Sequence, residues 1–331
     1  MDRAEQLRRW LNATLGGGLS IDPASDDASF RRYFRVRGGS SRTSLIAMDA
    51  PPDKESCEPF VRVARIFSEA GVHVPAIHAQ DLAQGFLLLS DLGDTTYLSA
   101  LDARSAGVLY GHALDALVRI QGASRPGALP DYDRVLLEKE LRLFPEWYVS
   151  RQLGRDLPPA QIENLENAFS TILANNLAQP RVFVHRDYHS RNLMVCEPCP
   201  GILDFQDAVY GPITYDLVSL LRDAYVAWEE ERIIDWTVRY WERARKASLP
   251  VAADFADFYR DFEWMGAQRQ LKVLGIFARL SFRDGKNGYL KDQPRVMGYL
   301  RRICERYRDL SPLVRVLDEL DATAKRFGYT F

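Results

Sequence analysis

A polar loop between short apolar segments constrains this chain more than any other part of its sequence. The loop follows Val182-Phe183-Val184, reads His185-Arg186-Asp187-Tyr188-His189-Ser190-Arg191-Asn192, and leads into Leu193-Met194-Val195. A third apolar segment, Ile202-Leu203, is followed directly by Asp204. The order His-x-Asp-x-x-x-x-Asn between apolar strands predicts a strand-loop-strand unit that presents carboxylate and amide groups together.

These residue types suit phosphoryl transfer. That reaction needs a hydroxyl aimed at the γ-phosphorus and Mg²⁺ held on the phosphate oxygens, with little covalent chemistry for the protein itself. Asp187 is our candidate for orienting the hydroxyl and accepting its proton. Asn192 and Asp204 supply the hard oxygen ligands that Mg²⁺ prefers. The alternative is an ordinary polar loop in which Asp204 caps a turn.

The spacing reproduces the catalytic-loop pattern of protein kinases. At two positions the chain departs from it, because His189 replaces the common lysine and Gln206 replaces the glycine of Asp-Phe-Gly. Both departures are shared with the aminoglycoside phosphotransferase and choline kinase superfamily. The chain resembles that superfamily from about Asp22 to about Tyr225. The resemblance implies an α+β, bilobal protein-kinase-like fold. A small N-terminal antiparallel-sheet lobe would span 1–92, and a large, mainly helical C-terminal lobe would span 93–331.

The pattern before the loop fits a small lobe with a sheet. Apolar residues at helical spacing predict a helix that starts near Leu7 and ends before Gly16-Gly17-Gly18. Residues 30–36 and 43–48 predict a hairpin, and 58–70 predict a helix. Residues 74–79 and 86–89 continue the sheet.

Nucleotide contacts are expected in this lobe. By resemblance, the polar segment 25–29 covers the phosphates through Ser29, although a solvated turn is an equal interpretation of its residues. The backbone of Ser90 and Leu92, after the last strand, would read the adenine edge. Met48 stands where a kinase strand carries its phosphate-binding lysine. Either another cation replaces that lysine, with Lys54, Arg32 and Arg35 as the neighbouring candidates, or the phosphates are held weakly. Of the three we count Arg32 among the nucleotide-binding residues.

The rest of the chain is predicted to be helical from its apolar recurrence. The predicted helices span 105–121, 136–153, 159–178, 215–225, 229–247, 252–282, 294–307 and 313–327. Pro145 should kink the second of these. Several aromatic residues fall in this region, and we expect most to be core and one or two to stack on a substrate ring: Trp228, Trp236, Trp241, Trp264 and Phe277.

Further roles follow for residues around the catalytic loop. We expect Gln206, Asp207 and His189 to contact the acceptor. His185 should brace the loop by hydrogen bonds, and Asp216 should cap a helix or hold Arg186 against the loop.

Composition argues against several classes of partner and site. The 331 residues are 47% hydrophobic with a formal net charge of −2, which argues against a nucleic-acid partner. No stretch approaches the ~18 apolar residues of a membrane span. Cys196 and Cys199 fall in a predicted hairpin turn, and without a second pair we interpret them as incidental thiols rather than a zinc or redox site. Reduced thiols and a nucleotide substrate predict a cytoplasmic protein.

Two stretches refine the resemblance. Residues 203–212 and Ala47-Met48-Asp49-Ala50-Pro51-Pro52 are similar to the bacterial N-acetylmuramate/N-acetylglucosamine anomeric kinases. That subfamily implies ATP with Mg²⁺ and a small amino-sugar acceptor, in the salvage of cell-wall sugars. Two alternatives stay open: another small acceptor, such as an aminoglycoside, choline or another amino alcohol, and a nucleotide-binding pseudokinase.

Overall fold

The computed structural model describes residues 2–25, 30–41 and 43–327. The chain forms two compact units. Unit 1 comprises residues 1–120 and 191–208, and unit 2 comprises residues 121–190 and 209–331. The chain therefore leaves unit 2 just before Asn192 and returns to it after Ala208. The lobe boundary at residues 92 and 93 stays a prediction.

Unit 1 contains the antiparallel sheet that the sequence predicts. Its strands are β1 (Ser20–Ser25), β2 (Arg32–Arg37), β3 (Leu45–Asp49), β4 (Ile77–Asp81) and β5 (Phe86–Ser90), in the spatial order β1-β2-β3-β5-β4. The edge strand β1 was not predicted, because its six residues SIDPAS combine few apolar groups with a proline. Its pairing with β2 supplies the order that its own sequence lacks.

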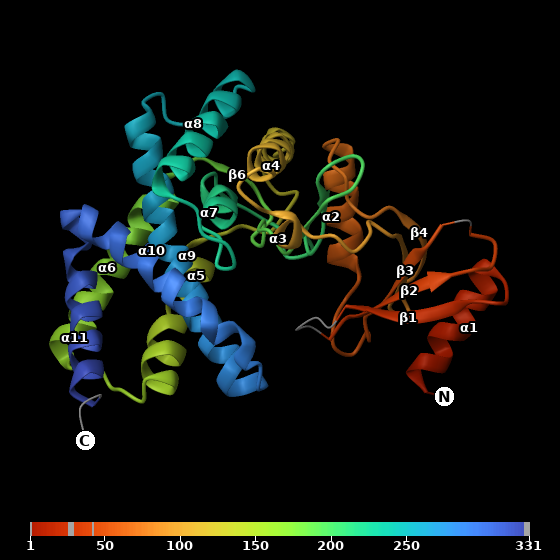
Figure 1. Ribbon diagram of the computed structural model, residues 1–331, viewed down its shortest axis with the longest axis horizontal. Helices are drawn as coiled ribbons and strands as arrows, with labels where there is room; N and C mark the ends of the chain where they lie inside the picture. The colour runs from red at the N-terminus through yellow and green to blue at the C-terminus, as the bar shows by residue number, and fades with distance from the viewer. Residues whose placement is uncertain (1, 26–29, 42, 328–331) are drawn as a thin grey trace. The chain divides into compact units, whose positions relative to one another are not determined.

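Helix α1 (Arg3–Leu15) covers one face of this sheet (Figure 1). Its buried leucines Leu7, Leu11 and Leu15 recur every four residues and pack on sheet residues such as Ala47 and Leu88. The helix ends at Gly16, whose φ of 86° suits glycine because it lacks a Cβ. The predicted N-terminal helix and its stop are thus confirmed.

Unit 1 also contains helices and the two short strands that follow the predicted catalytic loop. They are α2 (Glu58–Glu69), α3 (Tyr97–Ala100), α4 (Ala106–Gly122, whose last two residues belong to unit 2), β7 (Leu193–Met194) and β8 (Gly201–Ile202). β7 and β8 form the predicted hairpin, with Leu193 opposite Ile202. Phe205 follows this hairpin, and its ring packs on Phe60 and Phe67 of α2 at centroid distances of 4.7 and 5.9 Å.

Unit 2 is mainly helical. It contains the two-stranded sheet of β6 (Arg181–Val184) and β9 (Val209–Pro212), together with α5 (Arg134–Leu141), the π-helix η1 (Phe144–Gln152), α6 (Pro159–Ala178), α7 (Tyr215–Leu221), α8 (Glu230–Lys246), α9 (Phe255–Asp284), η2 (Asn287–Asp292), α10 (Gln293–Arg306), η3 (Arg308–Leu310) and α11 (Ser311–Phe327). Strand β6 leads directly into the catalytic loop. The long helix α9 contains 30 residues, of which the central part is buried.

The single kinked helix predicted over residues 136–153 was wrong. Two elements, α5 and η1, replace it. Pro145 has no N–H and cannot continue an α-helical ladder, and the chain continues in the wider π register instead. A Cβ on Gly275 of α9 would lie 2.4 Å from the backbone carbon of Leu143, so glycine lets α9 approach the junction of the two elements closely.

The described helices include none that is both long and apolar enough to cross a membrane.

Candidate active site

The predicted site residues fall into one group in each unit. The unit 2 group contains His185, Arg186, Asp187, His189 and Asp216, and the unit 1 group contains Arg32, Ser90, Leu92, Asn192, Asp204, Gln206 and Asp207. Ser29 lies outside the described residues.

The first half of the catalytic loop is held by Asp216. This carboxylate lies in the first turn of α7 and is fully buried. It accepts the backbone N–H of His185 at 2.6 Å and that of Arg186 at 3.0 Å. Arg186 has a φ of 77°, which costs energy for a residue with a Cβ, so these bonds fix a strained backbone just before Asp187. Burial raises the pKa of Asp216 to about 7, although the two N–H donors act to lower it.

The second half of the loop is held by Asp223. Its Oδ2 accepts the N–H of Ser190 at 2.9 Å, and its Oδ1 accepts the N–H of Tyr225, also at 2.9 Å. The helix predicted over 215–225 ends earlier, at Leu221. The residues beyond that end turn so that Asp223 satisfies backbone donors. The loop is therefore fixed at both ends by carboxylates of one chain segment.

A buried charge network supports Arg186. Its guanidinium donates to Glu140 Oε1 at 2.7 Å, and Lys272 Nζ lies 3.3 Å from the same oxygen. Tyr132 donates its hydroxyl to the other oxygen of Glu140, and Lys272 donates to Tyr215 at 2.8 Å. Because each charge has an opposite charge and hydrogen bonds, the network can stay ionised in the interior.

Asp187 lies among cationic side chains. Burial acts to raise its pKa, but the charges of Lys272, His189, Arg186 and Arg269 outweigh burial and lower the pKa to about 2. The carboxylate is therefore ionised at neutral pH. Its backbone N–H points to His185 Nδ1 at 3.3 Å, as a bracing role for that imidazole requires. Asp187 thus has the ionisation state of a group that orients a hydroxyl.

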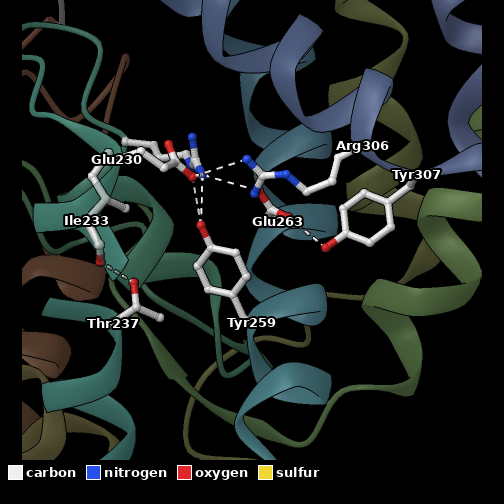
Figure 2. Close-up of polar contacts among 8 residues, drawn as sticks. Glu230, Ile233, Thr237, Tyr259, Glu263, Arg306 and Tyr307 are labelled. Atoms are coloured by element: carbon white, nitrogen blue, oxygen red, sulfur yellow. Dashed lines mark hydrogen bonds and ion pairs between the residues drawn. The ribbon is translucent and has the colours of Figure 1, made fainter. Parts of the chain in front are cut away.

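A second charged network fixes the segment next to Asp223 (Figure 2). The buried Arg222 lies 3.0 Å from Glu230 and 3.3 Å from Glu263, and Arg306 also pairs with Glu263. The hydroxyl of Tyr307 donates to Glu263 at 2.6 Å, and Figure 2 shows these side chains converging between helices. The network joins the start of α8 (Glu230) and α9 (Glu263) to the end of α10 (Arg306). It thereby anchors the turn that carries Asp223.

The unit 1 group centres on Asp204. This residue has a φ of 61°, again rare for a residue with a Cβ. Asn192 donates its amide to Asp204 Oδ2 at 3.3 Å, and Gln206 donates to Oδ1 at 2.8 Å. A backbone bond from Leu203 to the carbonyl of Asn192, 2.9 Å long, ties the two segments together. Asn192 and Asp204 therefore lie side by side, as their predicted joint role requires.

This donor set fits Mg²⁺. A carboxylate and an amide carbonyl are hard oxygen donors, and Mg²⁺ in such enzymes uses few protein ligands together with phosphate oxygens and water. The Oε1 atom of Gln206 is buried and has no hydrogen bond to a described residue. The amide of Gln206 donates to Asp204, and its predicted contact with the acceptor stays a prediction. Asp207 is exposed, and its acceptor contact stays a prediction.

The phosphate-binding cation that replaces the missing lysine stays a prediction. Met48 is fully buried in β3, opposite Tyr33 of β2. Arg32 pairs with Asp49 at 2.5 Å, and its side chain is half exposed. Arg35 is bound by Asp91 in a bidentate pair at 2.6 and 3.0 Å. Arg32 therefore has more freedom to meet a phosphate than Arg35.

The two predicted adenine contacts, Ser90 and Leu92, differ in whether their backbone already has a partner in the sheet. Ser90 donates its N–H to the carbonyl of Ala76 at 2.9 Å, and its hydroxyl accepts the N–H of Ala76 at 2.8 Å. Its N–H is thus committed to the sheet. Leu92 comes two residues later, beyond the end of β5, and it is the better candidate for reading a base.

A series of rings extends from the catalytic loop in unit 2. His189 packs edge-on against Tyr225 with centroids 5.5 Å apart, Tyr225 lies 6.1 Å from Phe277, and Phe277 lies 5.3 Å from Tyr289. Trp236 and Trp264 are buried, as expected of core residues. Within this series Tyr225 contacts His189 of the catalytic loop directly, and Phe277 comes next.

Four residues of these networks were not predicted from the sequence: Glu140, Asp223, Arg269 and Lys272. A signal for two of them is present in the sequence. Gln268-Arg269-Gln270-Leu271-Lys272 places four polar residues in the middle of an otherwise apolar helix. Polar groups at buried helical positions need partners, so such a run marks an internal network. Glu140 and Asp223 have no comparable local signal.

Comparison with known proteins shows the family to which the chain belongs. The phosphotransferase enzyme family matches residues 20–264. A protein named N-acetylmuramate/N-acetylglucosamine kinase from Neisseria meningitidis is 48% identical over 339 residues and covers 100% of both chains. A protein of the same name from Pseudomonas aeruginosa is 48% identical and covers 98% of each chain. The chain belongs to the phosphotransferase enzyme family. More specifically, it is an ATP-dependent phosphotransferase with an alcohol acceptor, as its sequence predicts.

Solved structures show the same fold. An ADP-bound aminoglycoside phosphotransferase matches 90% of this chain and 98% of its own with a TM-score of 0.56 at 14% identity. A choline/ethanolamine kinase family protein from Mesorhizobium loti matches 95% of this chain and 99% of its own with a TM-score of 0.60 at 15% identity. The predicted bilobal protein-kinase-like fold class is confirmed.

Proposed function

We propose that this enzyme transfers the γ-phosphoryl group of ATP to the anomeric hydroxyl of N-acetylmuramate and N-acetylglucosamine. The observation that carries the proposal is the match, over nearly the whole chain, to proteins named for these two sugars. The ionised Asp187 of unit 2, and the hydrogen-bonded pair of Asn192 and Asp204 in unit 1, would supply the chemistry that such a kinase needs. Such a reaction would return salvaged cell-wall sugars to use, and we place it in the cytoplasm, where ATP is available.

In the proposed mechanism, Asp187 accepts a hydrogen bond from the C1 hydroxyl and orients it towards the γ-phosphorus. A carboxylate with a low pKa is a weak base. It suffices here because the ring oxygen makes an anomeric hydroxyl more acidic than an ordinary alcohol. Most of the rate enhancement then comes from position. Asp216 and Asp223 act through the backbone, since they fix the loop on both sides of Asp187.

Asn192 and Asp204 would hold Mg²⁺ in unit 1. When bound, the ion neutralises charge on the phosphate oxygens. Gln206 donates to one oxygen of Asp204 and thereby fixes the direction of the carboxylate. Arg32 and the backbone of Leu92 would contact the phosphates and the adenine, respectively, and Ser29 is proposed by resemblance to cover the phosphates.

The acceptor sugar would lie in unit 2 against the rings near His189. Tyr225 and Phe277 are the nearest members of that series to the catalytic loop. Sugar rings present apolar C–H faces that pack on aromatic side chains. This placement leaves the C1 hydroxyl free to meet Asp187.

Methyl glycosides test the proposal. N-acetylmuramate and N-acetylglucosamine should each consume ATP and yield a product phosphorylated at C1, which phosphorus and proton NMR identify. Their methyl glycosides should be inert, because the methyl group blocks the reacting oxygen and leaves the other hydroxyls available. Phosphorylation of the glycosides at the rate of the free sugars would exclude anomeric transfer. Faster turnover of an aminoglycoside or choline would favour a different acceptor, and no ATP consumption with any acceptor would favour a pseudokinase.

A further inference from the structure

The middle of α9 is polar although it is buried. Gln268, Arg269, Gln270 and Lys272 are each at most 6% exposed. Buried polar side chains in folded proteins are almost always hydrogen-bonded. Each of these four residues should therefore have a partner, within the protein or in a ligand.

Three of the four have partners in unit 2. The contacts run from Gln268 to Glu140 at 3.1 Å, from Gln270 to the carbonyl of Arg222 at 3.1 Å, and from Lys272 to Tyr215 at 2.8 Å. Glu140 binds Arg186, and Arg222 precedes the loop-holding Asp223. This part of α9 therefore supports the catalytic loop through Glu140 and through the segment that carries Asp223.

Arg269 is the exception. It is 3% exposed, and its Nε and Nη1 atoms are buried without a hydrogen bond to any described residue. Lys272, three residues further along α9, contacts Tyr215 and Glu140 of the network that holds Arg186. The charge of Arg269 also lowers the pKa of both Asp187 and Asp216. A guanidinium offers five N–H donors in a fixed planar fork. Burying that fork without direct acceptors is costly, and an anionic ligand would supply the missing acceptors.

We propose that Arg269 binds the carboxylate of an acidic acceptor sugar. The inference rests on the proposed function, whose two sugars differ in one group. N-acetylmuramate carries a lactyl ether that ends in a carboxylate, and N-acetylglucosamine carries a hydroxyl there. Guanidinium and carboxylate form bidentate, charge-assisted hydrogen bonds. Arg269 thus favours the acidic sugar, while Asp187 serves the C1 hydroxyl of both.

Arg269 could also bind the phosphoryl group that is transferred, since that group is an anion as well. A comparison of the two sugars distinguishes this role from binding of the sugar carboxylate. Arg269→Gln removes the charge and keeps a polar, shorter side chain. In one preparation, kcat/KM for N-acetylmuramate should fall about ten- to hundredfold more than kcat/KM for N-acetylglucosamine. Arg269→Lys should restore part of the difference. An equal fall for both sugars would overturn the proposal, because phosphoryl or structural roles affect both.

A change in the ligand tests the same contact without a variant. With the wild-type enzyme, kcat/KM for the methyl ester of N-acetylmuramate should be about ten- to hundredfold lower than kcat/KM for the free acid. The Arg269→Gln enzyme should not distinguish ester from acid. Equal reaction of ester and acid with the wild type would refute the role of Arg269.

Arg279→Gln is the matched control. Arg279 lies on the same helix and also has a buried Nε without a hydrogen bond to a described residue. It should keep the wild-type ratio between the two sugars, and a ratio altered as strongly as in Arg269→Gln would count against the proposal. If the wild type phosphorylates neither sugar, the proposed function fails. If it phosphorylates both and the ratio ignores Arg269, only this inference fails.

Discussion

Asp223 accepts the backbone N–H of Ser190 at 2.9 Å, two residues before the chain reaches Asn192. Both residues are at most 1% exposed. This bond holds the end of the catalytic loop, as Asp216 holds its start. The loop is thus positioned by side chains that need not touch either substrate.

Asp223→Asn tests that relationship. An amide offers one acceptor oxygen where the carboxylate uses two, so either Ser190 or Tyr225 loses its partner. Turnover should fall about ten- to hundredfold through misplacement of the loop, while KM for ATP changes less. Steady-state kinetics would check this. Asp235→Asn, at an exposed pair with Arg239 on α8, is the control and should keep wild-type turnover. Unchanged turnover in Asp223→Asn would show that the bond is dispensable.

Asp187→Asn should leave nucleotide binding largely intact and reduce turnover by about two to four orders of magnitude, the range of general acid-base assistance. The amide keeps the shape of the side chain and loses its basicity. Calorimetric titration with nucleotide confirms that the variant is folded. Near-normal turnover would remove Asp187 from its proposed role.

The same variant has a pH signature. Burial opposes ionisation, but Lys272, His189 and the neighbouring arginines lower the pKa of Asp187 to about 2 from an ordinary value of 3.8. The ionised group therefore stabilises the folded state fully above 3.8, and this contribution is lost as the pH falls through 2. The variant should be less stable than the wild type by about 2 kcal/mol at neutral pH. Urea unfolding should show the gap closing only below about pH 4. A gap that closes near pH 6 would contradict the shift.

Asp204→Ala should weaken Mg²⁺-dependent ATP binding more than Asn192→Ala. A carboxylate contributes net charge to the ion, whereas an amide contributes only a dipole. Nucleotide titrations with and without magnesium measure the difference. If wild type and Asp204→Ala depend equally on magnesium, Asp204 is not the ligand.

Glu263→Gln should destabilise the protein by about 3 kcal/mol, because it leaves Arg222 in the interior with one fewer counter-charge. Arg222 and Glu263 have side chains at most 1% exposed. Denaturant unfolding compares the variant with Asp235→Asn, which breaks an exposed pair and should cost less than about 0.5 kcal/mol. Similar costs for the two variants would show that burial adds nothing to the network in Figure 2.

The sequence predicted those features that depend on local pattern. Helix α1 was visible from its leucine spacing, and the hairpin around Leu193 and Ile202 from its apolar segments and its turn. Strand β1 was not visible, because pairing with β2 rather than its own residues makes it a strand.

The residues of the candidate site also differ in whether a local sequence pattern reveals them. Asp187, Asn192 and Asp204 form a spacing pattern and could be named in advance. Glu140 contacts Arg186 from 46 residues away and Gln268 from 128 residues away. Contacts between segments so distant in the chain leave no periodic signal, so only the folded chain shows them.

Phe205 packs on Phe60 and Phe67 of α2, and its neighbour in the chain is Asp204. Within unit 1, the proposed magnesium ligand and α2 are therefore mechanically coupled through one ring. A displacement of α2 would change the backbone of Asp204 without occupying the space of ATP or sugar. Inhibition that began at α2 would thus weaken Mg²⁺-dependent ATP binding without competing for the place of either substrate.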